Sequence, residues 1–170
     1  MKKITACIDG NDMATIVGEA SFWAAKKLKA PLTLLHVLDK SEYQQNSVNG
    51  LSGAIGLGAH EVLLSELTRA DEIRSKLALQ YGNQLLDDLL MTAKKQPLEN
   101  VNKQQIHGDL VSSLLDLEST TRLFILGKSS QQEAENSHVV GSLLESVIRL
   151  IKSHLLIITQ PFQAPTSYMV

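Results

Sequence analysis

The sequence predicts an open, doubly wound α/β fold, and three observations indicate it. Four short apolar segments have the length and composition of buried strands, at 3–9, 32–38, 123–126 and 155–158, and a fifth, more polar segment at 101–106 has the length of a strand. Four segments with apolar residues at helical spacing separate them, so strands and helices alternate along the chain. Two of the strand segments, 32–38 and 123–126, are apolar almost throughout, which is typical of parallel strands covered by helices on both faces.

The chain begins with a strand, a helix and a second strand. Segment 3–9 is apolar until a polar turn interrupts it at Asp9. Apolar residues then recur at helical spacing from Ile16 to Leu28, and Pro31 ends this helix because proline cannot continue it. Segment 32–38 follows at once. This order predicts a parallel pair of strands joined by a right-handed crossover.

A long loop and a long helix come next. Residues 39–60 are polar and then glycine-rich, which predicts a long flexible loop. From Glu61 onward a helix is indicated, and its apolar residues lie along one stripe, as in an amphipathic helix. The stripe comprises Leu63, Leu67, Ala70, Ile73, Leu77, Tyr81, Leu85 and Leu89. Gly82 lies inside this helix at a cost of about 1 kcal/mol relative to alanine.

The second half of the chain completes the alternation. Segment 101–106 is polar for a strand, which favours an edge position, and Asp109 is a plausible cap for a short helix at 110–117. The compact strand 123–126 ends at Gly127. Ser142 and Glu145 match a capping box, so the last helix is expected to start at Ser142 and to run to about residue 152. These elements predict one domain over residues 1–159, with residues 160–170 as a tail or linker.

Composition excludes several classes of protein. The 170 residues carry a formal net charge of -2, which argues against a nucleic-acid partner bound through a broad basic surface. A single cysteine excludes an intramolecular disulfide framework and a cysteine-rich zinc module. No apolar run approaches the roughly 20 residues of a membrane span, and the first ten residues do not form a signal peptide. We therefore expect a cytoplasmic protein without a membrane span.

The sequence does not match the catalytic motifs with which we compared it. Gly127-Lys128-Ser129 mimics the end of a P-loop, but Arg122 occupies the position of the first glycine. His107 and Asp109 could form an acid–base pair, yet turn and cap roles are favoured at this position. Cys7 is interpreted as a small buried hydrophobic residue. The sequence therefore predicts no enzyme, no catalytic residues and no metal site.

The candidate binding residues follow the strands. In a doubly wound sheet, ligands bind beyond the carboxyl ends of the strands, where the strand order reverses. Asp9, the turn after Val37, the turn at 107–109 and the segment from Gly127 to Ser142 occupy such positions. The last of these joins a strand end to a helix N-terminus that carries a hydroxyl, an arrangement that suits a phosphate group.

Six pieces of the sequence, in their order and spacing, resemble the universal stress protein family. They are 4–10, 30–37, 108–109, 123–127, 141–142 and 155–158, so the resemblance covers about residues 3–158. It implies a Rossmann-like sheet of the adenine nucleotide alpha hydrolase-like type, with strand order 3-2-1-4-5. It also implies dimerisation through the last strand.

The resemblance further implies an adenine nucleotide, ATP or AMP, with Mg²⁺ as an accompanying ion. Nucleotide-binding members carry Gly-x-x-Gly, nine residues, and then Gly-Ser or Gly-Thr. Gly127, Gly141 and Ser142 match this motif, whereas Ser130 replaces the second glycine and the spacer 131–140 has ten residues. A serine Cβ limits how closely a backbone can approach a ligand.

Two further positions match those that contact the nucleoside in the family. Asp9 corresponds to the aspartate that contacts the ribose, and Val37 to the valine beside the adenine. Glu133 and Glu135, in the spacer, would repel a triphosphate unless they point away. Three functions stay open: a stress-response regulator that binds nucleotide, a structural or interaction module without ligand, and an ATP-cleaving enzyme, for which no general base is evident.

The end of the chain resembles a linker. Residues 160–167 contain two prolines and precede Tyr168-Met169-Val170, which looks like the beginning of another first strand. This arrangement is similar to the N-terminal half of a tandem universal stress protein. We therefore expect either a homodimer or a pseudo-dimer of tandem domains, and a disordered tail is the alternative.

Overall fold

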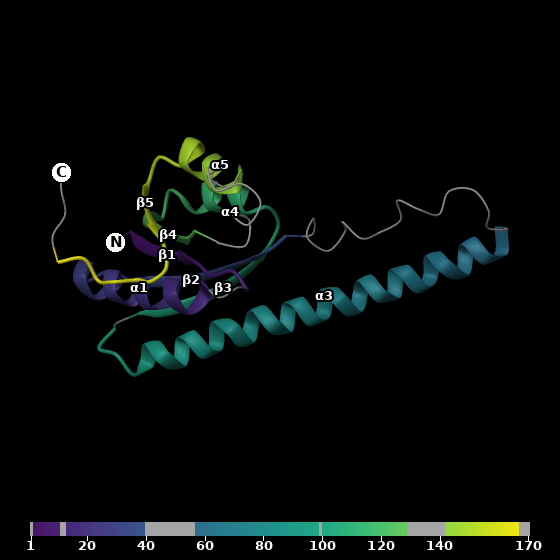
Figure 1. Cartoon of the computed structure of the whole chain (residues 1–170), viewed down its shortest axis with the longest axis horizontal. Coiled ribbons are helices and arrows are strands. Elements are labelled where there is room, and N and C mark those ends of the chain that lie inside the picture. Colours follow the sequence, from purple (N-terminus) through teal and green to yellow (C-terminus); the bar gives the residue numbers. More distant parts are fainter. Residues whose placement is uncertain (1, 11–12, 40–56, 99, 129–141, 167–170) are drawn as a thin grey trace.

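A computed structural model describes residues 2–10, 13–39, 57–98, 100–128 and 142–166, without the side chains of residues 57–64 and 142. In these residues one parallel sheet has the order β3-β2-β1-β4-β5 (Figure 1). Its strands are β1 (Lys3–Cys7), β2 (Leu32–Leu38), β3 (Val101–His107), β4 (Thr121–Gly127) and β5 (His154–Ile158). The helices are α1 (Met13–Leu28), α3 (Leu57–Lys94), α4 (Leu110–Leu117) and α5 (Ser142–Leu150). The expected doubly wound fold and strand order are confirmed.

Helices cover both faces of the sheet. Ile4, Ala6 and Ile8 pack with buried residues of α1 and α3, whereas Leu35 and Phe124 pack with those of α4 and α5. Figure 1 shows α1 and α3 on one side of the sheet, with α4 and α5 on the other. Because side chains alternate between the two faces of a strand, both sets of positions must be apolar. This double coverage explains the continuous apolar run of β2.

The edge position expected for β3 is also confirmed. β3 pairs only with β2 within the described sheet, and its residues are half-buried or exposed. The Nζ of Lys103 lies 2.7 Å from Oδ1 of Asp87 on α3. A polar edge strand of this kind hinders pairing with another sheet.

The helix α3 begins earlier than its sequence predicts. We expected a loop over residues 39–60 and a helix from Glu61, but α3 already includes residues 57–60. Leucine and alanine at 57 and 59 favour the helix, and one glycine between them costs only about 1 kcal/mol. The remainder of the expected loop, 40–56, lies outside the described residues.

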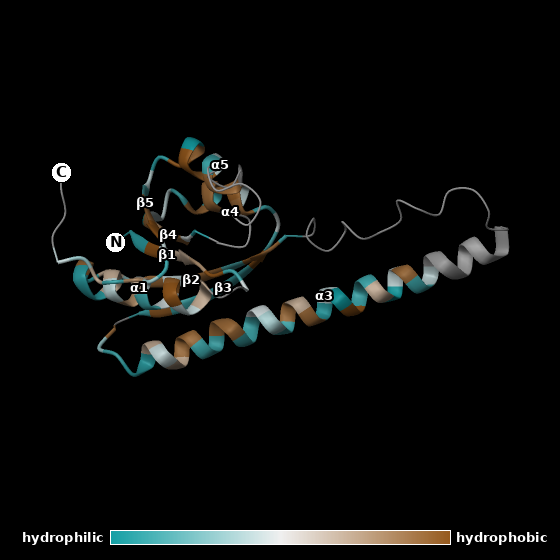
Figure 2. Cartoon of the chain, viewed as in Figure 1, coloured by the Kyte–Doolittle hydropathy of each residue, from teal (hydrophilic) through white to brown (hydrophobic). Residues whose placement is uncertain are grey.

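Only the C-terminal part of the apolar stripe on α3 packs against the sheet. Leu89 of the stripe and the neighbouring Leu86 are buried, whereas Ile73, Leu77 and Tyr81 are 51%, 59% and 57% exposed. With 38 residues, α3 is about 57 Å long, far longer than a seven-residue strand of about 23 Å. The helix therefore extends past the sheet, as Figure 1 shows, and Figure 2 shows apolar residues on this protruding part.

The segment after β5 returns to α1. The rings of Phe162 and Trp23 meet edge to face, with centroids 6.2 Å apart. Phe162 is half-buried beside the core between the sheet and α1. The start of the segment 160–170 is thus held against the domain, while the division of the chain at residue 159 stays a prediction.

Gly82 is required by the packing of α3 on the sheet. A Cβ at this position would overlap the imidazole of His36 and the side-chain amide of Gln105. His36 is itself fixed, since its Nδ1 lies 2.7 Å from the carbonyl oxygen of Ile8. The glycine therefore allows α3 to approach β2 and β3 closely, which outweighs its low helix propensity.

We expect the Gly82→Ala substitution to lower the free energy of unfolding by about 2 kcal/mol, because overpacking exceeds the gain in helix propensity. Urea denaturation measures this change. Gln80→Ala, at an exposed position two residues before Gly82 and on the opposite side of the helix, is the control and should leave stability nearly unchanged. A Gly82→Ala protein as stable as the wild type would contradict the close packing.

Candidate functional site

The strand order reverses between β1 and β4, at the carboxyl edge of the sheet. Two backbone hydrogen bonds extend the sheet to this edge. The N–H of Ile8 donates to the carbonyl oxygen of Leu35 at 2.7 Å, and the N–H of Lys128 donates to the carbonyl oxygen of Ile158 at 2.8 Å. Gly127 therefore ends β4 and Asp9 follows the end of β1, and these two neighbouring strands lie about 4.8 Å apart. Val37 lies next to the end of β2, on the other side of β1.

The described part of the chain brings three of the six expected site residues to one edge. These are Asp9, Val37 and Gly127. Ser130 and Gly141 lie outside the described residues, as does the side chain of Ser142. The helix α5 does begin at Ser142, as expected, and it ends at Leu150, two residues before the expected end.

Asp9 and Cys7 are electrostatically coupled at the end of β1. Burial and, to a smaller extent, the negative charge of Asp9 together raise the pKa of the Cys7 thiol to about 12. The carboxylate of Asp9 is exposed, whereas Cys7 is half-buried. The thiol is therefore protonated at neutral pH, which agrees with its interpretation as a small hydrophobic residue.

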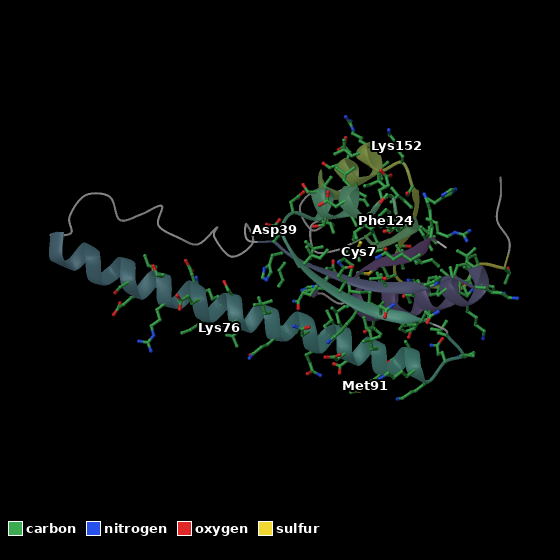
Figure 3. All side chains as sticks on the ribbon, turned by 180° about the vertical axis from the view of Figure 1, so that it is seen from behind. Cys7, Asp39, Lys76, Met91, Phe124 and Lys152 are labelled. Atoms are coloured by element: carbon green, nitrogen blue, oxygen red, sulfur yellow. The ribbon has the colours of Figure 1, made fainter. Side chains whose placement is uncertain are left out.

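Val37 belongs to an apolar surface on the α4 side of the sheet. Together with Ile106, Leu110 and Val111 it is half-buried against a core that includes Leu35 and Phe124. Figure 3 shows Cys7 and Phe124 within the body of the domain and Asp39 where β2 leaves the sheet. An exposed carboxylate beside an apolar surface can orient a ligand that has hydroxyl groups and a flat ring.

Gly127 has a packing role of its own. A Cβ at Gly127 would lie 2.9 Å from Cγ2 of Val17 and 3.1 Å from Cβ of Met13. The first turns of α1 therefore pack directly on the end of β4. This contact requires a glycine whether or not a ligand binds nearby.

The turn at 107–109 has the structural role favoured by its sequence. Gly108 has a φ of +142°, a conformation that side chains other than glycine rarely adopt. Oδ2 of Asp109 accepts hydrogen bonds from the N–H and the hydroxyl of Ser112, at 2.8 and 2.9 Å. Asp109 is thus the N-cap of α4, which confirms the preferred interpretation over an acid–base pair.

Tyr81 also lies at this edge, where its sequence pattern did not predict it. The hydroxyl of Tyr81 donates to the carbonyl oxygen of Gly10 at 3.0 Å, and its ring leaves no room for a Cβ there. Tyr81 was expected only as a member of the apolar stripe of α3. The available signal was a tyrosine in an otherwise aliphatic stripe, since its hydroxyl needs a polar partner.

Neither a metal centre nor a membrane span is found in the described ranges. No three His, Cys, Asp or Glu side chains gather there as metal ligands. None of the described helices combines the length and hydropathy that crossing a bilayer requires.

Known proteins resemble this chain in sequence and in fold. Residues 1–159 match the profile of the Universal stress protein family. The universal stress protein Slr1230 of Synechocystis sp. is 32% identical over 170 residues, which are 99% of this chain and 59% of that protein. The chain thus spans little more than half the length of this curated relative.

Two solved structures with the same fold contain nucleotides. A universal stress protein in complex with cAMP is 15% identical, with a TM-score of 0.56 over 93% of this chain and 97% of that one. A universal stress protein from Archaeoglobus fulgidus in complex with dAMP is 13% identical, with a TM-score of 0.51 over 92% and 97%.

The position of Cys7 predicts low reactivity. A thiol with a pKa of about 12 instead of 9.0 has a thiolate fraction at pH 8 about a thousandfold below the ordinary value. We therefore expect a disulfide reagent to label the native protein far more slowly than the urea-unfolded chain. Asp9→Asn should speed native labelling modestly, because burial is the larger cause. Equal rates in native and unfolded protein would contradict this environment.

Proposed function

The chain belongs to the universal stress protein family, and on this premise we propose that it binds an adenine nucleotide at the carboxyl edge of its sheet. It would then act as a stress-response regulator rather than as an enzyme. The observation that supports the proposal is that Asp9 and Gly127 lie where the strand order reverses, with Val37 near the end of the next strand, β2. The cAMP and dAMP complexes of two structural neighbours support the choice of ligand.

Each residue has a distinct role in this proposal. The exposed carboxylate of Asp9 accepts hydrogen bonds from the ribose hydroxyls. The adenine lies on the apolar surface around Val37, and the phosphate lies at the N-terminus of α5, where free N–H groups favour an anion. Gly127, Ser130, Gly141 and Ser142 border the phosphate.

The departures from the family motif favour a short phosphate chain. Ser130 adds a Cβ where the family has glycine, and Glu133 and Glu135 place two negative charges in the spacer. Repulsion grows with the negative charge of the ligand, so AMP is expected to bind more tightly than ATP in the absence of Mg²⁺. A cytoplasmic location stays a prediction from composition.

The packing of Gly127 favours a second candidate function. Because α1 requires this glycine, its presence does not by itself indicate a nucleotide. The chain would then be a structural or interaction module of a tandem protein, in keeping with its coverage of 59% of the Synechocystis relative.

Assembly through β5 completes the proposal. β5 is an edge strand of the described sheet, and Ile157 on it is 37% exposed. Leu115 of α4 and Ile148 and Leu150 of α5 are also exposed. An edge strand beside exposed apolar side chains can pair with a second such strand, from another copy or from a tandem domain.

Calorimetry on the purified full chain tests the nucleotide. We expect AMP to bind, and Asp9→Ala to weaken binding about tenfold or more through the lost charged hydrogen bond. Gly141→Asp should abolish binding, because it places a carboxylate against the phosphate. Asp116→Ala, at an exposed carboxylate on α4, is the matched control. Absence of heat with AMP and ATP, and of nucleotide in the purified protein by mass spectrometry, would favour the structural module.

Sedimentation equilibrium tests the proposed assembly. We expect Ile157→Lys to weaken self-association through β5, because it places a charge within the apolar contact. Gln96→Lys adds the same charge at an exposed position after α3, and it should leave the apparent molar mass of the assembly as in the wild type. An Ile157→Lys protein that associates as strongly as the wild type would argue against pairing through β5.

A further inference from the structure

Two hydrogen bonds hold the backbone on either side of Asp9. On β2, Nδ1 of His36 lies 2.7 Å from the carbonyl oxygen of Ile8, and it donates because a carbonyl only accepts. On α3, the hydroxyl of Tyr81 donates to the carbonyl oxygen of Gly10 at 3.0 Å. Ile8 and Gly10 are the residues immediately before and after Asp9. We call these two donors, His36 and Tyr81, the Asp9 bracket.

One turn of α3 seats both donors of the Asp9 bracket. Gly82, next to Tyr81 in the chain, leaves the space that the His36 ring occupies. The Tyr81 ring lies against Gly10, where an added Cβ would be only 2.9 Å from its Cε1 atom. The bracket is therefore set by the same close packing that holds α3 against β2.

The sheet itself supports this segment only as far as Ile8. In the described residues, the backbone ladder of β1 ends with the N–H of Ile8, which donates to the carbonyl oxygen of Leu35. Asp9 and Gly10 are both exposed, so water competes for their polar groups. The hydroxyl of Tyr81 extends the support of the backbone two residues further, to Gly10.

We propose that Tyr81 is a positioning residue for the nucleotide, because it holds the backbone next to Asp9 so that the carboxylate is already placed for the ribose hydroxyls. This inference rests on the proposed function. Tyr81 acts through Asp9 and does not itself contact the ligand. Because a preordered group loses less conformational freedom on binding, fixing the backbone raises the affinity without adding a contact to the nucleotide.

The hydroxyl of Tyr81 distinguishes this role from that of a core residue. The side chain is exposed, so its ring contributes little to the core. The partner of the hydroxyl lies 71 positions away in the sequence, next to Asp9, and not on α3. Tyr81→Phe removes the oxygen alone and leaves the ring in place, so this substitution tests the Asp9 bracket.

Nitrogen-15 relaxation of the full chain without nucleotide measures the order of this backbone. We expect the order parameter of Gly10 to lie near the roughly 0.85 of rigid backbone in the wild type and to fall toward about 0.6 in Tyr81→Phe. Thr92→Val is the matched control, because Thr92 is also exposed on α3 but its hydroxyl donates to the carbonyl oxygen of Asp88 in the same helix, at 3.0 Å. It should leave the order parameter of Gly10 unchanged. An equally ordered Gly10 in Tyr81→Phe would overturn the inference.

Calorimetry with AMP tests whether Tyr81 acts through Asp9. We expect Tyr81→Phe to weaken AMP binding about threefold, less than Asp9→Ala does, because the carboxylate is still present but is held less firmly. In the Asp9→Ala background, Tyr81→Phe should cause no further loss of affinity. A tyrosine that only stabilised the fold would show no such dependence on Asp9. Thr92→Val should bind AMP as the wild type does.

The outcomes of calorimetry separate this inference from the proposed function. Tyr81→Phe binding AMP as tightly as the wild type, or an equal loss with and without the Asp9 carboxylate, would overturn the inference and leave the proposed function intact. A wild type that binds neither AMP nor ATP would refute the proposed function, and with it the role of Tyr81 in binding.

Discussion

The burial of β1 between two strands and two layers of helices is the constraint on which the rest of the structure depends. Its side chains at residues 4–6 are fully buried, so a polar group there must find a partner inside the protein. Thr5 does so by a 2.9 Å hydrogen bond to the hydroxyl of Thr121 on β4, and no buried side-chain polar atom among the described residues lacks a partner. Because β1 is held from all sides, the backbone at its end is fixed in position. Asp9, two residues after the end of β1, is therefore exposed at a defined place.

The glycines near the sheet allow the helices to approach it closely. Gly18 admits a methyl group of Leu89, Gly82 admits the ring of His36, and Gly127 admits Val17. In each case the space that a Cβ would fill is occupied by a neighbouring side chain. A glycine in a family motif can therefore be required by the fold alone, which limits what its presence says about ligand binding.

The strands and their double coverage could be predicted from the sequence, because continuous apolar runs arise only when both faces of a strand are buried. The strand order came from the resemblance to a family and not from periodicity. Periodicity also failed to show that Ile73 and Leu77 lie beyond the sheet, since a repeat shows that one side of a helix is apolar but not what covers it. The contact of Tyr81 with Gly10 joins residues 71 positions apart, and a local pattern does not contain such information. The phosphate side of the candidate site, at Ser130 and Gly141, stays a prediction.

The hydrogen bond between Tyr81 and Gly10 makes α3 a lever arm. The helix is a single stiff rod whose sheet-bound end is fixed by Leu86 and Leu89, and Tyr81 stands at the fulcrum, where the rod leaves the domain. The protruding part of the helix is long, and its base contacts Gly10. A tilt of α3 would therefore displace Tyr81 and, with it, the backbone next to Asp9. The Tyr81 phenol group thus connects the protruding helix directly to the backbone next to Asp9.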